Sequence, residues 1–186
     1  MYKEIMPHRF KGDFSRLESK ERKQIMPANY LLQKMKIKKG DTLIDFGCGI
    51  GYFSIPALDF VGEKGAVIAI DVSNEMLQEL AKRVKNHKNL KIIQADTLVG
   101  LEANIILLSM VLHEITNPKK FLNNCFKSLK PNGRVIVIDW QKKDTGKMGP
   151  PFEDRLAKED VIKLANIKYI EHHVHECVYF LEFKKD

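Results

Sequence analysis

From residue 40 to residue 140, short apolar runs rich in β-branched residues alternate with stretches of helical periodicity. The apolar runs occupy residues 42–46, 66–70, 90–93, 105–108 and 135–138, and the helical stretches occupy 52–60, 73–83 and 119–129. Continuous apolar strands that alternate with amphipathic helices form parallel sheets with helices on both faces. This alternation therefore predicts a doubly wound α/β fold built on a mostly parallel sheet.

The two ends of the chain follow other patterns. Residues 168–175 and 178–183 are strand-like runs with only a short connection between them, which predicts a β-hairpin. Such an antiparallel pair fits the edge of a parallel sheet. Residues 1–40 are predicted to form a polar helical leader that ends at Gly40-Asp41.

Length, apolar runs and cysteines limit the cellular setting. A chain of 186 residues suits one domain. Its longest apolar run, residues 103–112, is interrupted by polar side chains and falls short of the roughly 18 residues that span a bilayer. The N-terminus lacks the apolar block of a signal peptide, and the three scattered cysteines form no CxxC pair. We therefore expect a cytoplasmic protein with no membrane span.

The net charge of +7 lies entirely in the leader. Residues 1–40 contain 11 Lys or Arg and 4 Asp or Glu, whereas residues 41–186 contain 20 of each kind. A basic segment of this sort attracts an acidic substrate, nucleic acid or an anionic surface. A solvated basic helix face is equally compatible with the charge.

Three glycines at alternate positions follow the first predicted strand, in the segment Asp45-Phe46-Gly47-Cys48-Gly49-Ile50-Gly51. A glycine turn between a strand and a helix lets the backbone approach a ligand closely, and the start of the helix favours an anionic group. The G-x-G-x-x-G pattern of dinucleotide-binding proteins would need a glycine where this chain has Tyr52. The segment instead resembles motif I of class I S-adenosylmethionine-dependent methyltransferases.

Acidic residues end the next two predicted strands. Asp71 lies 20 residues after Gly51, the distance at which a carboxylate accepts hydrogen bonds from ribose hydroxyls. This signal indicates a ribose without choosing the cofactor, because NAD enzymes use the same arrangement. Asp96 follows the third strand, where the methyltransferase family contacts the adenine amino group.

The resemblance covers roughly residues 39–140. It implies S-adenosyl-L-methionine as the cofactor and a seven-stranded sheet with an antiparallel edge hairpin. The expected single methyltransferase domain spans 1–186, with the leader at 1–40, a cofactor-binding core at 41–140, and a loop, helix and edge hairpin at 141–186. The implied cofactor contacts are Asp45, Phe46, Gly47, Gly49, Asp71, Val72, Met76, Asp96, Thr97 and Ser109.

Individual roles follow from the same resemblance. Gly47 and Gly49 would line the methionine half of the cofactor, and Asp45 would act on the methionine amino group through the turn. Val72 and Met76 would pack on the adenine. One departure is the short segment 97–104 after Asp96, where many relatives carry an acidic and aromatic insertion, so the adenine side of the site is expected to be thin.

The sulfonium makes the methyl group electrophilic, so positioning of the acceptor supplies much of the rate. His113, just after the fourth predicted strand, is the candidate general base for an acceptor that loses a proton. The alternative is a structural histidine at a helix start. Trp140 ends the fifth strand, and the loop 141–149 is interpreted as either a lid or an ordinary connection.

A zinc site is the alternative interpretation of His172-His173-x-His175, where His173 and His175 share one face of a strand with Cys177 next in register. No fourth ligand is evident, and the alternating pattern favours a hairpin. We expect no metal site.

The predicted function is methyl transfer from S-adenosylmethionine to a small-molecule acceptor. The basic leader is compatible with an anionic acceptor. Three alternatives remain. The basic leader is compatible with an RNA methyltransferase, the glycine turn with an NAD-dependent oxidoreductase, and the whole pattern with a non-catalytic S-adenosylmethionine-binding module. The sequence does not indicate an oligomeric state.

Overall fold

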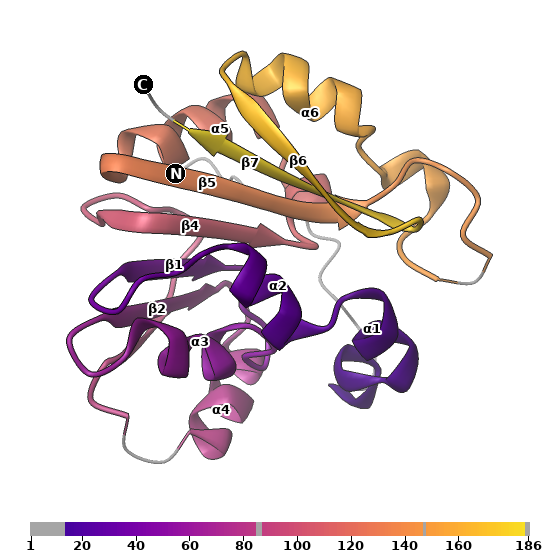
Figure 1. The fold of residues 1–186 in the computed structure, drawn as a ribbon. Coiled ribbons are helices and arrows are strands. Elements are labelled where there is room, and N and C mark those ends of the chain that lie inside the picture. Colours follow the sequence, from indigo (N-terminus) through magenta and orange to yellow (C-terminus); the bar gives the residue numbers. More distant parts are fainter. Residues whose placement is uncertain (1–13, 85–86, 147, 185–186) are drawn as a thin grey trace.

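The computed structural model describes residues 14–84, 87–146 and 148–184 (Figure 1). Its strands are β1 (Thr42–Phe46), β2 (Ala66–Asp71), β3 (Leu90–Gln94), β4 (Ala103–Ser109), β5 (Leu129–Trp140), β6 (Tyr169–His175) and β7 (Val178–Lys184). Its helices are α1 (Lys20–Ile25), α2 (Ala28–Lys34), α3 (Ser54–Val61), α4 (Asn74–Arg83), α5 (Pro118–Lys127) and α6 (Lys158–Ala165). Three short 3₁₀ helices are η1 (Phe14–Glu18), η2 (Leu112–Glu114) and η3 (Phe152–Asp154).

The seven strands form one sheet in the order β3-β2-β1-β4-β5-β7-β6. Neighbouring strands from β3 to β5 are parallel, whereas β7 is antiparallel to both β5 and β6. The predicted doubly wound sheet with an antiparallel edge hairpin is confirmed. The strand order reverses direction at β1, between β2 and β4, and in open α/β sheets such a switch point is where ligands bind.

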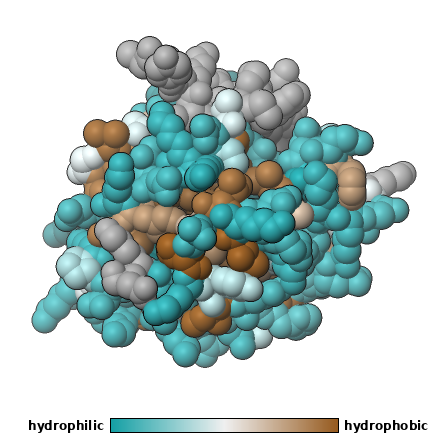
Figure 2. Space-filling view, turned by 90° about the horizontal axis from the view of Figure 1, so that it is seen from above, coloured by the Kyte–Doolittle hydropathy of each residue, from teal (hydrophilic) through white to brown (hydrophobic). Residues whose placement is uncertain are grey.

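Helices pack on both faces of the sheet (Figure 1). Side chains alternate along each strand: Ile106 and Leu108 of β4 belong to the core beneath α5 and α6, whereas Ile105 and Leu107 belong to the core beneath α2 and α3. Burial on both faces explains why these strands read as continuous apolar runs. From above, hydrophobic atoms gather near the centre of a mostly hydrophilic surface (Figure 2).

Several element boundaries differ from the sequence prediction by a few residues, and two of the differences have a clear structural reason. Helix α3 begins at Ser54 rather than at residue 52, because the glycine turn continues to Phe53. Strand β5 begins at Leu129 rather than at residue 135, because Leu129 already pairs with Ala103 and the register shifts before the next pair. The turn containing Asn132, with φ of 60°, lies inside this interrupted strand.

The described part of the leader is helical, as predicted. The hydroxyl of Ser19 accepts the backbone N–H of Arg22 and so caps α1. The guanidinium of Arg134 on β5 donates to the carbonyls of Met35 and Lys36. The sheet therefore fixes the end of α2. The leader residues 1–13 lie outside the described residues.

Candidate active site

A cavity of about 790 Å³ lies at the carboxyl ends of the central strands, a volume in the range of small-ligand sites. Its lining residues come from the leader, the glycine turn, the ends of β2, β4 and β5, and the loop before α6. They include Leu17, Arg22, Phe46, Gly47, Gly49, Asp71, Val72, Met76, Ala95, Ser109, Met110, His113, Glu114, Trp140, Met148, Gly149, Pro150, Pro151 and Asp154. The carboxyl ends of the neighbouring strands β1, β2 and β4 and the leader thus line one cavity.

The glycine turn is tied to the end of β2. The N–H groups of Gly47 and Cys48 both donate to the carbonyl of Ile70, at 2.8 and 3.0 Å. Gly47 has φ of 74°, and a Cβ at this position would lie 2.7 Å from Cγ2 of Val111. Only glycine meets both conditions without strain. This residue is therefore required by the packing of the turn.

Asp71 joins three parts of the site. One carboxylate oxygen accepts the N–H of Gly49 and the other accepts the N–H of Ser73, each at 2.8 Å. The carboxylate also lines the cavity. Asp71 therefore holds the glycine turn to the start of α4 while its side chain faces the cavity.

Asp45 lies beneath the glycine turn and not among the residues that line the cavity. It is 2 % exposed, and its carboxylate accepts the hydroxyl of Ser54 at 2.5 Å. Burial raises the pKa of Asp45 to about 6, with a further contribution from the charge of Asp71. Any effect of Asp45 on a ligand therefore passes through the turn.

Of the residues that follow β3, Ala95 lines the cavity, whereas the predicted contacts Asp96 and Thr97 do not. Ala95 lines the cavity together with Val72 and Met76. Asp96 and Thr97 are not among the lining residues of the described cavity. Their assignment to adenine stays a prediction from family resemblance.

The end of β4 contributes a polar group without a partner. The hydroxyl oxygen of Ser109 is buried and has no hydrogen-bond partner among the described residues, and Ser109 lines the cavity. The next residue, Met110, has φ of 55°, which is uncommon for a residue with a side chain. A buried hydroxyl without a partner costs free energy, so a ligand that hydrogen-bonds Ser109 would be favoured.

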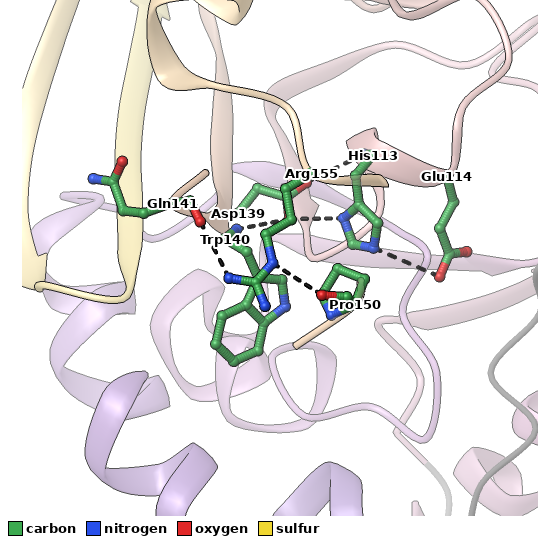
Figure 3. Close-up of polar contacts among 7 residues, drawn as sticks. All are labelled: His113, Glu114, Asp139, Trp140, Gln141, Pro150 and Arg155. Atoms are coloured by element: carbon green, nitrogen blue, oxygen red, sulfur yellow. Dashed lines mark hydrogen bonds and ion pairs between the residues drawn. The ribbon is translucent and has the colours of Figure 1, made fainter. Parts of the chain in front are cut away.

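His113 forms a buried pair with Asp139 at the end of β5 (Figure 3). Nδ1 of His113 lies 2.7 Å from Oδ1 of Asp139, and the backbone N–H of His113 donates to the other oxygen at 3.3 Å. The backbone N–H of Trp140 also donates to Asp139. Because a carboxylate only accepts, Nδ1 carries the proton and Nε2 is left for a reacting group.

The ionisation of this pair is shifted by its surroundings. Burial by itself lowers the pKa of His113, but the Asp139 carboxylate outweighs it, with help from Glu114 and Asp154, and the pKa is raised above 6.5. Burial raises the pKa of Glu114 to about 7, and its Oε1 lies 4.0 Å from Nε2 of His113. Two titratable groups with shifted pKa values in one cavity are typical of a catalytic site.

Arg155 fixes the loop that forms the outer wall (Figure 3). Its guanidinium donates to the carbonyls of Pro150, Lys143 and Met148 at 2.7–2.9 Å and lies 5.8 Å from the ring of Trp140. The described part of the loop is thereby held against Trp140 and forms a wall of the cavity.

Several functional candidates were not predicted as site residues from the sequence: Arg22, Glu114, Asp139 and Arg155. The only local signal was the position of Glu114 and Asp139 beside the recognised residues His113 and Trp140. Arg22 and Arg155 come from segments whose sequence has no recognisable motif. Only the fold brings them to the cavity.

The histidine run on β6 has other partners than a metal. Nε2 of His172 lies 3.2 Å from Glu182 of β7, and Nδ1 of His175 accepts the N–H of Cys177. Within residues 14–84, 87–146 and 148–184 there is no group of three or more His, Cys, Asp or Glu side chains that could hold a metal ion.

Comparison with known proteins agrees with this geometry. A family model described as a methyltransferase domain matches residues 37–181. The chain belongs to this methyltransferase family. The resemblance found in motif I is thereby confirmed, and the family match extends well beyond the residues that carried it.

The chain is also similar to solved structures of methyltransferases. A SAM-dependent methyltransferase from Aquifex aeolicus is 26% identical, with a TM-score of 0.83 over 94% of this chain and 99% of that one. The plantazolicin methyltransferase BpumL, solved in complex with SAH, has a TM-score of 0.69 at 13% identity over 95% of this chain and 91% of its own. The latter likeness shows the fold alone.

A curated relative is the ubiquinone/menaquinone biosynthesis C-methyltransferase UbiE of Haemophilus ducreyi. It is 27% identical over 113 residues, which are 57% of this chain and 44% of the relative. The chain spans about half the length of the curated relatives it matches. Among the described residues of the chain, no helix is both long and apolar enough to cross a bilayer.

Proposed function

We propose that this chain transfers the methyl group of S-adenosylmethionine to an uncharged, largely apolar small molecule. The observation that carries the proposal is a single cavity that joins the glycine turn and Asp71 to His113 and Trp140. The residues expected to bind the cofactor and the candidate general base thus line one cavity. Methyl transfer needs this juxtaposition, because the donor and the acceptor must be held in line.

The residues on one side of the cavity fit S-adenosylmethionine. Asp71 would accept the ribose hydroxyls, and the apolar side chains of Val72, Met76 and Ala95 would pack against the adenine. The buried hydroxyl of Ser109 would gain a polar partner. The bound cofactor supplies an electrophilic methyl group.

The remaining cofactor contacts are proposed from the family resemblance. Phe46, Gly47 and Gly49 line the cavity and would lie beside the methionine half. Asp45 would support the turn through its hydrogen bond with Ser54. Asp96 and Thr97 are retained as candidate contacts to the adenine.

The other side of the cavity is apolar and acidic. Trp140, Met148 and Pro150 provide an apolar wall, whereas Glu114 and Asp154 carry carboxyl groups. Like charges disfavour an anionic acceptor here, despite the basic leader. A quinone-type ring, to which the name of the Haemophilus ducreyi relative refers, is one acceptor of the proposed kind.

His113 would remove a proton from such an acceptor. Its Nδ1 donates to Asp139, which holds the ring in one orientation and stabilises the imidazolium that forms. Asp139 acts through His113 and is a positioning residue. The proposed domain organisation is one methyltransferase domain over residues 1–186, in which the leader closes one side of the cavity.

Calorimetry with S-adenosylmethionine, S-adenosylhomocysteine and NAD tests the cofactor. The first two should compete for one site, and NAD should bind far more weakly. Asp71→Ala should weaken S-adenosylhomocysteine binding more than about tenfold, because charge-assisted hydrogen bonds to ribose are lost. Tight NAD binding without S-adenosylmethionine binding would refute the proposal.

Incubation of the protein and a cell extract with methyl-labelled S-adenosylmethionine, followed by mass spectrometry, tests the acceptor. An uncharged, apolar labelled product is expected. Labelled RNA would favour an RNA methyltransferase, and cofactor binding with no labelled product in any fraction would favour a non-catalytic module.

A further inference from the structure

The described leader packs directly over the glycine turn. A Cβ placed on Gly49 would lie 3.9 Å from Cδ1 of Leu17 in η1. The hydroxyl of Tyr52, which follows the turn, donates to the carbonyl of Met26 at 2.6 Å. Three elements of the leader, η1, α1 and the segment after α1, therefore form one wall of the cavity.

Arg22 of α1 is the cationic residue of this wall. It lines the cavity, and its Cζ lies 4.8 Å from the centre of the Tyr52 ring. Among the lining residues of the described chain, it is the only lysine or arginine, whereas Glu21, Asp71, Glu114 and Asp154 are acidic. Among these lining residues, Arg22 is therefore the permanent positive charge with which an anionic group could pair.

The charge of Arg22 is poorly compensated within the described chain. Its Nε is buried and has no hydrogen-bond partner there. The two carboxylates that act on it electrostatically, Asp45 and Glu18, are hydrogen-bonded or paired elsewhere: Asp45 with Ser54 at 2.5 Å, and Glu18 with Arg83 at 2.8 Å.

Burial lowers the pKa of Arg22, in keeping with the cost of moving a guanidinium away from water. An arginine that bears this cost gains most from a planar anion, because its fork of N–H groups matches a carboxylate.

We propose that Arg22 binds the carboxylate at the methionine end of S-adenosylmethionine. The inference rests on the proposed function, in which that end of the cofactor lies at the glycine turn. Arg22 reaches the turn from α1, so the leader supplies a cofactor contact that lies outside the motif region at residues 39–140. The aromatic ring of Tyr52 supports the guanidinium from one side.

A second role for Arg22 has to be separated from this one. The side chain also lowers the pKa of the buried Asp45, so its loss could disturb the turn and weaken every ligand. A pair of ligands that differ only in the carboxylate resolves the two roles. S-adenosylhomocysteine carries this group, and S-adenosyl-3-thiopropylamine keeps the amine and lacks the carboxylate.

The experiment measures the dissociation constants of both ligands by calorimetry for the wild type, Arg22→Met and Arg22→Lys. Lys23→Met is the matched control, because it removes one positive charge from an exposed position of the same helix. The wild type and Lys23→Met should prefer S-adenosylhomocysteine by about ten- to one-hundredfold. This preference should fall to within about twofold in Arg22→Met, and Arg22→Lys should keep part of it.

Equal weakening of both ligands in Arg22→Met, with the preference intact, would overturn the proposal and leave Arg22 a structural role. Should Arg22→Met fail to fold, an unchanged preference in Arg22→Lys would also count against it, because lysine cannot reproduce the bidentate fork. Failure of the wild type to bind either ligand would instead refute the proposed function.

Discussion

At the scale of single residues, the pair of His113 and Asp139 is the most direct test of proton chemistry. With the acceptor found by labelling, His113→Ala should lower turnover by about 10²–10⁴-fold because the general base is lost. S-adenosylhomocysteine affinity should stay within about twofold, measured by calorimetry. Normal turnover would indicate catalysis by positioning alone.

Asp139→Asn separates orientation from proton transfer. His113 accepts a proton only in its neutral form, so the rate should rise with pH through the pKa of His113, which Asp139 raises. Without this carboxylate the burial of His113 lowers its pKa, and the acidic limb of the kcat profile should move to lower pH. An acidic limb that stays in place would exclude Asp139 as a positioning residue.

The buried Asp45 should make the free energy of unfolding depend on pH. Its pKa is about 6 in the folded chain against an ordinary 3.8, so the folded state binds more protons between these values. The free energy of unfolding should therefore fall as pH rises through this window, by about 3 kcal/mol in all.

Urea unfolding of the wild type and Asp45→Asn at pH 4 and pH 7 measures this effect. Relative to the variant, the wild type should lose about 2 kcal/mol between the two pH values, because part of the window lies below pH 4. Glu114, whose pKa is also raised, is present in both proteins and cancels. Asp59→Asn, at an exposed position of α3, is the control. An equal pH dependence in wild type and Asp45→Asn would contradict the prediction.

At the scale of elements, the turn between β1 and α3 is specified by local sterics. Gly47 and Gly100 have similar φ, 74° and 78°, but a Cβ on Gly47 would meet Val111 at 2.7 Å and one on Gly100 would meet nothing within 4 Å. Gly100→Ala should cost about 1 kcal/mol of stability from backbone strain. Gly47→Ala should cost a further 1–3 kcal/mol or so from overpacking.

Denaturant unfolding of both glycine variants compares the two costs directly. Equal losses would mean that the contact between the turn and Val111 relaxes freely, and that backbone strain alone requires glycine at residue 47. A larger loss in Gly47→Ala would confirm that the turn is packed against the segment that leads to His113.

At the scale of the whole molecule, the described part of the leader borders the cavity. Removal of residues 1–20 deletes Leu17 and the Ser19 cap of α1, both of which are close to the site. The hydrophobic core clusters of the described chain contain none of residues 14–20, so unfolding should stay cooperative. Cofactor affinity should fall, because one wall of the cavity is lost.

Calorimetry at several salt concentrations measures the consequence. The deleted residues hold five Lys or Arg and three Asp or Glu, and the truncated chain keeps Arg22. Because the proposed acceptor is uncharged, its affinity should depend little on salt in either chain, and a salt dependence that becomes flatter on truncation would instead indicate an anionic acceptor attracted by the leader. Identical cofactor and acceptor binding at every ionic strength would show that residues 1–20 have no part in the site.

The sequence by itself determined the parallel sheet, the edge hairpin and the glycine turn, because strand burial and turn conformation are set by neighbouring residues. It also indicated Asp71 and His113, since residues that end parallel strands meet at one edge. The start of β5 was missed because a pairing between Leu129 and Ala103 leaves no local pattern.

Only the tertiary structure decided which side chains share the cavity. Asp139 lies 26 positions from His113, Arg155 fixes a loop through backbone carbonyls that any sequence would offer, and Arg22 comes from a leader without a motif. Their contacts depend on chain segments that the sheet order brings together. Periodicity reports which face of an element is buried, and it carries no information about the partner across a cavity.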